Sequence, residues 1–143
     1  WSNKAITTLL ENWEKLIKKG LKPEDIVTIA SHHGGSQAIT TLLENWDDLL
    51  KLELKFEDIV SIASHNGASQ AITTLLENWE KLIKKGLKPE DIVSIASHSG
   101  GSQAITTLLE NWDDLIDQEY TESEIVNIFS SQDGVLKLLA ELD

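Results

Sequence analysis

The sequence lacks cysteine, methionine and arginine, and it holds only two prolines among its 143 residues. Without cysteine, neither a disulfide framework nor a thiolate metal site can form. No apolar run approaches the length of a membrane-spanning helix, and no signal-peptide pattern is visible. We therefore expect an intracellular protein that has no membrane partner.

Positive charge is scarce along the whole chain. All 12 basic residues are lysine, against 24 acidic residues, and the net charge is −12. Proteins that bind by neutralising phosphate carry basic stripes, and anionic membrane surfaces attract basic segments. The charge balance therefore argues against both of these binding modes.

The charge also alternates at one place in the chain, the region that follows each Glu-Asn-Trp triplet. Two of these regions are basic and two are acidic: Lys15, Lys18 and Lys19; Asp47 and Asp48; Lys81, Lys84 and Lys85; and Asp113, Asp114, Asp117 and Glu119. If neighbouring regions stack, we expect salt bridges between them, each weak because such pairs are exposed. A device that fixes the register of stacking is the alternative interpretation.

A repeat of 33 residues organises the sequence. The segment Ala-Ile-Thr-Thr-Leu-Leu-Glu-Asn-Trp occurs at 5–13, 38–46, 71–79 and 104–112, and Ile-Ala-Ser-His-x-Gly occurs three times. Repeats of this length are typical of solenoids. We expect an all-α fold, a right-handed superhelical solenoid of two-helix repeats. Its units are a partial repeat at 1–20, repeats at 21–53, 54–86 and 87–119, and a divergent cap at 120–143.

Each full repeat contains a short helix, a glycine-containing loop and a longer helix. In 21–53, Pro23 suits the first turn of the short helix, and glycines after His33 allow a tight turn with positive φ. The long helix is expected from about Ser36, its N-cap, to Leu52. Its buried face is predicted to contain Ala38, Leu42, Leu43, Trp46, Leu49 and Leu50.

The ends of the long helices and the tryptophans also follow the repeat. Gly20 and Gly86 stand where two long helices should end, whereas the other two have Glu53 and Glu119 there. Trp13, Trp46, Trp79 and Trp112 occur once per repeat. We interpret these rings as core between repeats, with base stacking as the minority alternative.

The two termini depart from this pattern. Thr121 and Glu124 form a possible capping box, residues 130–134 form a divergent loop, and 135–143 form the tail of a capping unit. Trp1 aligns with Gly34, so the chain opens within a repeat and is expected to be part of a longer protein.

The segment 87–105, with its invariant-then-variable pair before the glycines, resembles the repeat of transcription activator-like (TAL) effectors and their bacterial relatives. The likeness covers about four-fifths of the chain, and the joint pattern is specific. It implies a solenoid whose loops enter the major groove of double-stranded DNA and meet one base per repeat.

The resemblance also implies a role for each loop residue. His33, Asn66 and Ser99 would contact bases, with purines, guanine above all, preferred at the first two and little selectivity at Ser99. His32, His65 and His98 would steady the loops by bonding back to the short helix. The phosphate-contacting residues would be Gly34, Gly35, Ser36 and Gln37; Gly67, Ala68, Ser69 and Gln70; and Gly100, Gly101, Ser102 and Gln103.

The chain differs from the plant-pathogen repeats in three respects. Ser36, Ser69 and Ser102 stand where lysine or arginine is usual, and Asp47, Glu80 and Asp113 stand near the place of a proline that bends the long helix. The third difference is the acidic charge, together with the lack of the basic N-terminal region by which those effectors first grip DNA. Binding by this chain alone is therefore expected to be weak.

Other functions remain as alternatives. The repeats could be a scaffold or protein-interaction array, natural or engineered, with no DNA binding of its own. Histidines spaced one per repeat do not converge as zinc ligands must, so we expect no metal and no cofactor. No catalytic constellation stands apart from the repeat, so we expect no enzyme and no small-molecule substrate. The chain is expected to be a monomer.

Overall fold

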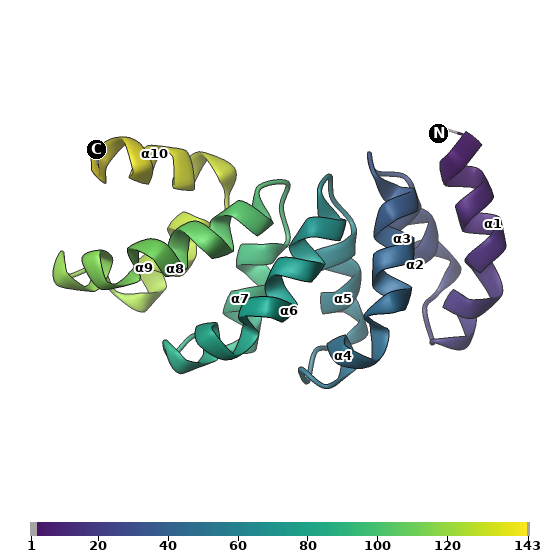
Figure 1. Ribbon diagram of the computed structural model, residues 1–143, viewed down its shortest axis with the longest axis horizontal. Coiled ribbons are helices and arrows are strands. Elements are labelled where there is room, and N and C mark those ends of the chain that lie inside the picture. The colour runs from purple at the N-terminus through teal and green to yellow at the C-terminus, as the bar shows by residue number, and fades with distance from the viewer. Residues whose placement is uncertain (1–2, 143) are drawn as a thin grey trace.

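The computed structural model describes residues 3–142, and Trp1 lies outside this range. The described chain is all-α, and its helices follow one another along the long axis from the N-terminal to the C-terminal end (Figure 1). The helices are α1 (Asn3–Lys18), α2 (Pro23–Ala30), α3 (Gly35–Glu44), α4 (Trp46–Leu50), α5 (Phe56–Ala63), α6 (Ala68–Lys84), α7 (Pro89–Ala96), α8 (Gly101–Asp117), α9 (Glu122–Phe129) and α10 (Gln132–Leu142).

The short helices α2, α5, α7 and α9 begin where the sequence predicts them. Pro23 and Pro89 occupy the first turn, where a missing N–H costs nothing. An acid at the third helical position accepts the N–H of the residue before each helix, as Asp25 does from Lys22 at 3.3 Å. The same bond recurs at Asp58 and Asp91. This cap and the helix dipole both favour the acidic first turn.

One long helix differs from the prediction. The expected helix from Ser36 to Leu52 is divided at Asn45 into α3 and α4, whereas α6 and α8 run without interruption. The break coincides with a contact between the Trp46 and Phe56 rings, whose centroids are 5.9 Å apart. Other repeats have proline or glutamate at the position of Phe56, so they cannot form this aromatic pair. The repeats therefore have one sequence pattern but not one backbone.

All four long segments end in the left-handed conformation. Gly20 and Gly86 have φ of 100° and 97°, and Glu53 and Glu119, which align with them, have φ of 63° and 69°. Glycine adopts this conformation without steric cost, whereas glutamate does so at a cost. The helix end is thus set by the repeat geometry, and glycine at two of the four positions avoids the steric cost of the left-handed conformation.

The hydrophobic core lies between successive helix pairs. The long segments pack in the order α1, α3, α6 and α8, and each short helix packs against its own long helix and the next short helix. Trp46 and Trp112 are buried, and Trp13 and Trp79 are partly buried against the same core, as the core interpretation requires. The predicted face is wrong at Leu50, which is exposed near the helix end. It also omitted Ile39, which is fully buried.

The C-terminal unit closes the stack. Thr121 and Glu124 form the predicted capping box, with reciprocal bonds of 3.1 Å between each backbone N–H and the other side chain. The loop predicted at 130–134 is wrong in part, because α10 already begins at Gln132. Helix α10 then packs on α9 and α8, where Val135 and Leu138 are buried.

The predicted salt bridges between repeats are not formed. Within residues 3–142, the one ion pair joins Lys51 and Asp48 at 3.9 Å, and both belong to the same helical turn. Stacked repeats bring the helix axes together at the core, while the long charged side chains extend into solvent, where pairing gains little. The charged helix ends are therefore unpaired with one another. No described helix has the length and apolar character needed to cross a membrane.

Candidate nucleic-acid interface

Three loops join a short helix to the long helix that follows, and they contain the residues predicted to contact DNA. They lie at 31–34, 64–67 and 97–100, along one edge of the molecule in Figure 1, opposite the ends of the long helices. Because each loop is carried by one helix pair, stacking sets the loops next to each other in chain order. The geometry is that of a row of three similar tips.

The three variable residues are exposed at these tips. His33, Asn66 and Ser99 have solvent-accessible side chains in the described structure. Asn66 also contacts the preceding loop, since its Oδ1 accepts the His33 backbone N–H at 3.1 Å. Only the oxygen of the Asn66 amide can accept from a backbone N–H, so this bond fixes the orientation of the amide. Its Nδ2 donors are then directed elsewhere. Sequence reasoning missed this bond, which depends on the stacking of neighbouring repeats.

The histidines predicted to steady the loops do not share one set of hydrogen bonds. His98 Nδ1 accepts the Gly100 N–H at 3.1 Å, so the neutral ring carries its proton on Nε2, which lies 3.1 Å from the Phe129 carbonyl. The TAL resemblance implies a bond from His98 back to its own short helix. In the structure His98 bonds instead to the next short helix, α9.

His65 uses the opposite tautomer. Its Nδ1 lies 2.8 Å from the Asn66 carbonyl, an acceptor, so Nδ1 carries the proton. Its Nε2 is buried and has no hydrogen-bond partner. His32 is only partly buried. The three histidines thus occupy equivalent sequence positions with three different sets of contacts, and two of them hold a loop.

The glycines set the start of the long helices. Gly34 and Gly67 have φ of 81° and 82° and are the N-cap residues of α3 and α6, whereas Gly100 has φ of −97°. The positive φ predicted for the tight turn is therefore present in two of the three loops. The prediction of Ser36 as N-cap is wrong, because the helix already starts at Gly35.

Several groups predicted to contact phosphate bond within the protein. The N–H groups of Gly35 and Gly101 donate to the His32 and His98 carbonyls, at 2.9 and 2.8 Å. Ala68 makes the equivalent, longer bond to His65. The glutamines Gln37, Gln70 and Gln103 are exposed on the first turn of the long helices. These side-chain amides therefore remain accessible to a ligand.

The serines at positions 36, 69 and 102 form a ladder between repeats. Threonine and serine hydroxyls meet across neighbouring long helices in three pairs: Thr8 with Ser36 at 2.8 Å, Thr41 with Ser69 at 2.6 Å, and Thr74 with Ser102 at 2.6 Å. An asparagine in each unit donates to the carbonyl of the same threonine, as Asn45 does to Thr41 at 2.8 Å. These partly buried hydroxyls join the repeats, and lysine at these positions would remove the bond.

Ser69→Ala should leave the Thr41 hydroxyl partly buried without its partner and cost about 1 kcal/mol of unfolding free energy. The double variant Thr41→Val/Ser69→Ala should cost less than the sum of its two single changes, because each removes the same bond. Urea denaturation of all four proteins gives the coupling, and Ser61→Ala, at an exposed serine of α5, is the control. Additive losses would mean that the ladder contributes nothing to stability.

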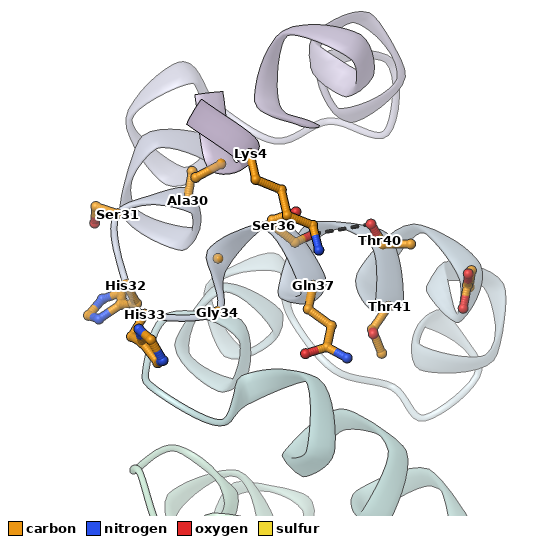
Figure 2. Close-up of a pocket in the computed structure, with 13 residues that line it drawn as sticks. Lys4, Ala30, Ser31, His32, His33, Gly34, Ser36, Gln37, Thr40 and Thr41 are labelled. Carbon is orange, nitrogen blue, oxygen red and sulfur yellow. Dashed lines mark hydrogen bonds between the residues drawn. The ribbon is translucent and has the colours of Figure 1, made fainter. Parts of the chain in front are cut away.

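A hollow of about 770 Å³ lies beside the first loop. Figure 2 shows Lys4 of α1 above it and Gln37, Thr40 and Thr41 along the adjacent face of α3, with His32 and His33 at the loop. Glu44 also lines this hollow. The surface beside the loop is thus polar, with one lysine and one carboxylate, and it presents no basic stripe.

No family model matches the chain, and no curated protein matches it. Among residues 3–142, no group of three or more histidine, cysteine, aspartate or glutamate side chains is placed to hold a metal ion. What the site can do must therefore be inferred from the geometry of its loops.

Proposed function

We propose that this chain binds double-stranded DNA through its loops, with His33, Asn66 and Ser99 each facing one base in the major groove. The helix pairs would form a right-handed superhelical solenoid of 33-residue repeats that follows the groove. The observation that carries the proposal is the row of three exposed tips, in which a polar side chain varies while the surrounding loop is retained.

The contacts of Asn66 support a purine preference. Its Oδ1 is held by the His33 N–H, so Nδ2 is the group available to a ligand. An N–H donor in the major groove matches N7 of either purine and O6 of guanine, and the one pyrimidine acceptor there is O4 of thymine. The bond also joins the first two tips, which would reduce the freedom lost when both meet adjacent bases.

Energetics predict weak binding. Good bidentate base contacts contribute about 1–3 kcal/mol each, so three tips supply at most roughly 3–9 kcal/mol. The loss of translational and rotational freedom on association costs about 4–15 kcal/mol. With a net charge of −12 and no lysine in the loops, phosphate contacts add little. Tight binding would need basic regions of a longer protein.

A scaffold without DNA binding is the second candidate. The Ser36, Ser69 and Ser102 hydroxyls bond between repeats, and the Gly35 and Gly101 amides bond within their loops. These groups are thus engaged in holding the array together rather than left for phosphate. In this case the variable tips would have no common ligand, and changes at them would leave every binding property unaltered.

Asn66→Gly tests the two candidates against each other. Loss of the side-chain amide should change base preference at one position of the bound sequence and leave the helical content unaltered. Selection from a randomised duplex library, followed by sequencing, measures this preference, and circular dichroism checks the fold. Asn127→Ser, at an exposed asparagine of α9 away from the tips, is the matched control. An unaltered preference in Asn66→Gly would rule out a base contact at this tip.

A further inference from the structure

The edge opposite the loops carries an alternating pattern of charge. It is formed by the ends of the four long segments, here called the helix tails, at residues 14–19, 47–52, 80–85 and 113–118. In Figure 1 the first three tails lie along the lower edge, and the fourth, at the end of α8, lies at the left. The first and third tails each contain three lysines and one glutamate, for a formal charge of +2. The second contains two aspartates and Lys51, which pairs with Asp48 at 3.9 Å, and the fourth contains three aspartates, for formal charges of −1 and −3. Along the molecule, the tails therefore read basic, acidic, basic, acidic.

The lysines of the basic tails line two equivalent grooves. In the first, of about 640 Å³, Lys15, Lys18 and Lys19 face Leu43 and Glu44 of the next long segment. The second, of about 600 Å³, has the same composition 66 residues further on, with Lys81, Lys84, Lys85, Leu109 and Glu110. Within residues 3–142, no carboxylate lies within ion-pair distance of these lysines. Each groove thus presents three lysines that form no ion pair, beside one carboxylate.

An aliphatic row accompanies the charges. Ile17, Leu50, Ile83 and Ile116 occupy the same position in each tail and are between 38% and 44% exposed. Other positions of this helix stripe are buried in the core, as Ile39, Leu42 and Trp46 are. One exposed aliphatic side chain per repeat, beside alternating charges, is the composition of an interface: apolar contact at its centre and charge that sets the register.

We propose that the helix tails form an interface with a second copy of this chain, arranged antiparallel about a two-fold axis. This pairing sets the second tail of one copy against the third tail of the other, and it does so twice by symmetry. Asp47 and Asp48 of each copy then face Lys81 and Lys84 of the other. The first and fourth tails match in the same way, so every basic tail meets an acidic one. The chain is thus a dimer rather than the monomer expected from the sequence.

The charge pattern selects this partner and this orientation. A parallel arrangement in register would set like charges opposite each other, which is destabilising. An edge of four tails that alternate basic and acidic is complementary to the same edge in reversed order. A second copy of this chain provides that edge. The net charge of −12 per copy opposes association, but at physiological ionic strength it is screened beyond about 8 Å, whereas contact pairs are closer than this. The loops lie on the other edge and remain free in the dimer.

The test is a charge swap measured by sedimentation velocity. The wild-type chain should form a dimer whose population rises with concentration and falls at high salt. Lys81→Glu/Lys84→Glu and Asp47→Lys/Asp48→Lys should each be monomeric alone, because like charges then meet at the centre. An equimolar mixture of the two variants should form a heterodimer, since both central contacts become complementary again.

Lys4→Glu/Lys137→Glu is the control, because it changes the net charge by the same amount as Lys81→Glu/Lys84→Glu at lysines outside the tails. It should dimerise nearly as the wild type does. A monomeric wild type at all concentrations, dimers in either swapped variant alone, or no heterodimer in the mixture would each overturn the proposal. Circular dichroism of every variant separates loss of association from loss of fold. DNA binding through the loops is independent of these outcomes.

Discussion

Trp46→Ala is expected to lower the free energy of unfolding by about 3–5 kcal/mol, the usual cost of removing a large buried aromatic ring. Trp46 is only 3% exposed and packs against Phe56, at the point where the long helix divides into α3 and α4. Because small domains are stable by only about 5–15 kcal/mol, this loss would be a large part of the total. Urea denaturation followed by circular dichroism measures it.

Trp79→Ala is the matched control for this prediction. Trp79 follows the same Glu-Asn dipeptide in the next repeat, but its ring is only partly buried, and residue 89 is proline where Trp46 has Phe56. Less apolar area returns to water, so the loss of stability should be clearly smaller. Equal losses in the two variants would contradict the difference in packing between these repeats.

Phe129→Ala should destabilise the C-terminal cap by a similar amount, about 3–5 kcal/mol. Phe129 is fully buried at the end of α9, and its carbonyl also lies 3.1 Å from His98 Nε2. The cavity should loosen the packing of α10 and the anchor of the third loop together. Hydrogen exchange should show faster exchange in α9 and α10, and urea denaturation should show the loss of stability.

The other phenylalanine provides the control for the cap. Phe56 is 45% exposed at the start of α5, so Phe56→Ala should cost much less than Phe129→Ala. Its effect on exchange should also be confined to the region around Trp46. Unaltered protection of α9 and α10 in Phe129→Ala would mean that this ring does not hold the cap in place.

Local signals in the sequence predicted the elements of this fold well. Proline and acidic first turns located the short helices, and Thr121 with Glu124 located the cap helix. These signals act over a few residues, so they can be identified without knowledge of the tertiary structure. The all-α character follows from the same periodicity, and the structure confirms it.

Features that depend on neighbouring repeats could not be predicted in this way. The sequence predicts Ser36 as an N-cap. In the structure its hydroxyl instead forms a hydrogen bond with the hydroxyl of Thr8, which lies 28 residues earlier in the chain. Identical Glu-Asn-Trp triplets give a buried ring at Trp46, which packs beside Phe56, and a partly exposed one at Trp79. Contacts between repeats therefore override propensities that are the same in every repeat.

The same distinction between local signals and contacts across repeats applies to the candidate site. The variable tips were identified from the repeat alone, and all three are exposed. The bond from the His33 N–H to Asn66, and that from His98 to Phe129, cross from one repeat to the next. The first prepares Asn66 to present its amide donors, and the second holds the third loop on the cap. That the row of tips reads DNA is our proposal, and it rests on their exposure and on the variation of one polar residue within a retained loop.

The most direct test of DNA reading is fluorescence anisotropy with labelled duplexes, one guanine-rich and one of random sequence, at low and at physiological salt. The account predicts weak binding that favours the guanine-rich duplex and decreases as salt rises, because the tips favour purines and the few lysines supply a small electrostatic contribution. No binding to either duplex at low salt would contradict it, and the array would then be a scaffold with no DNA site of its own.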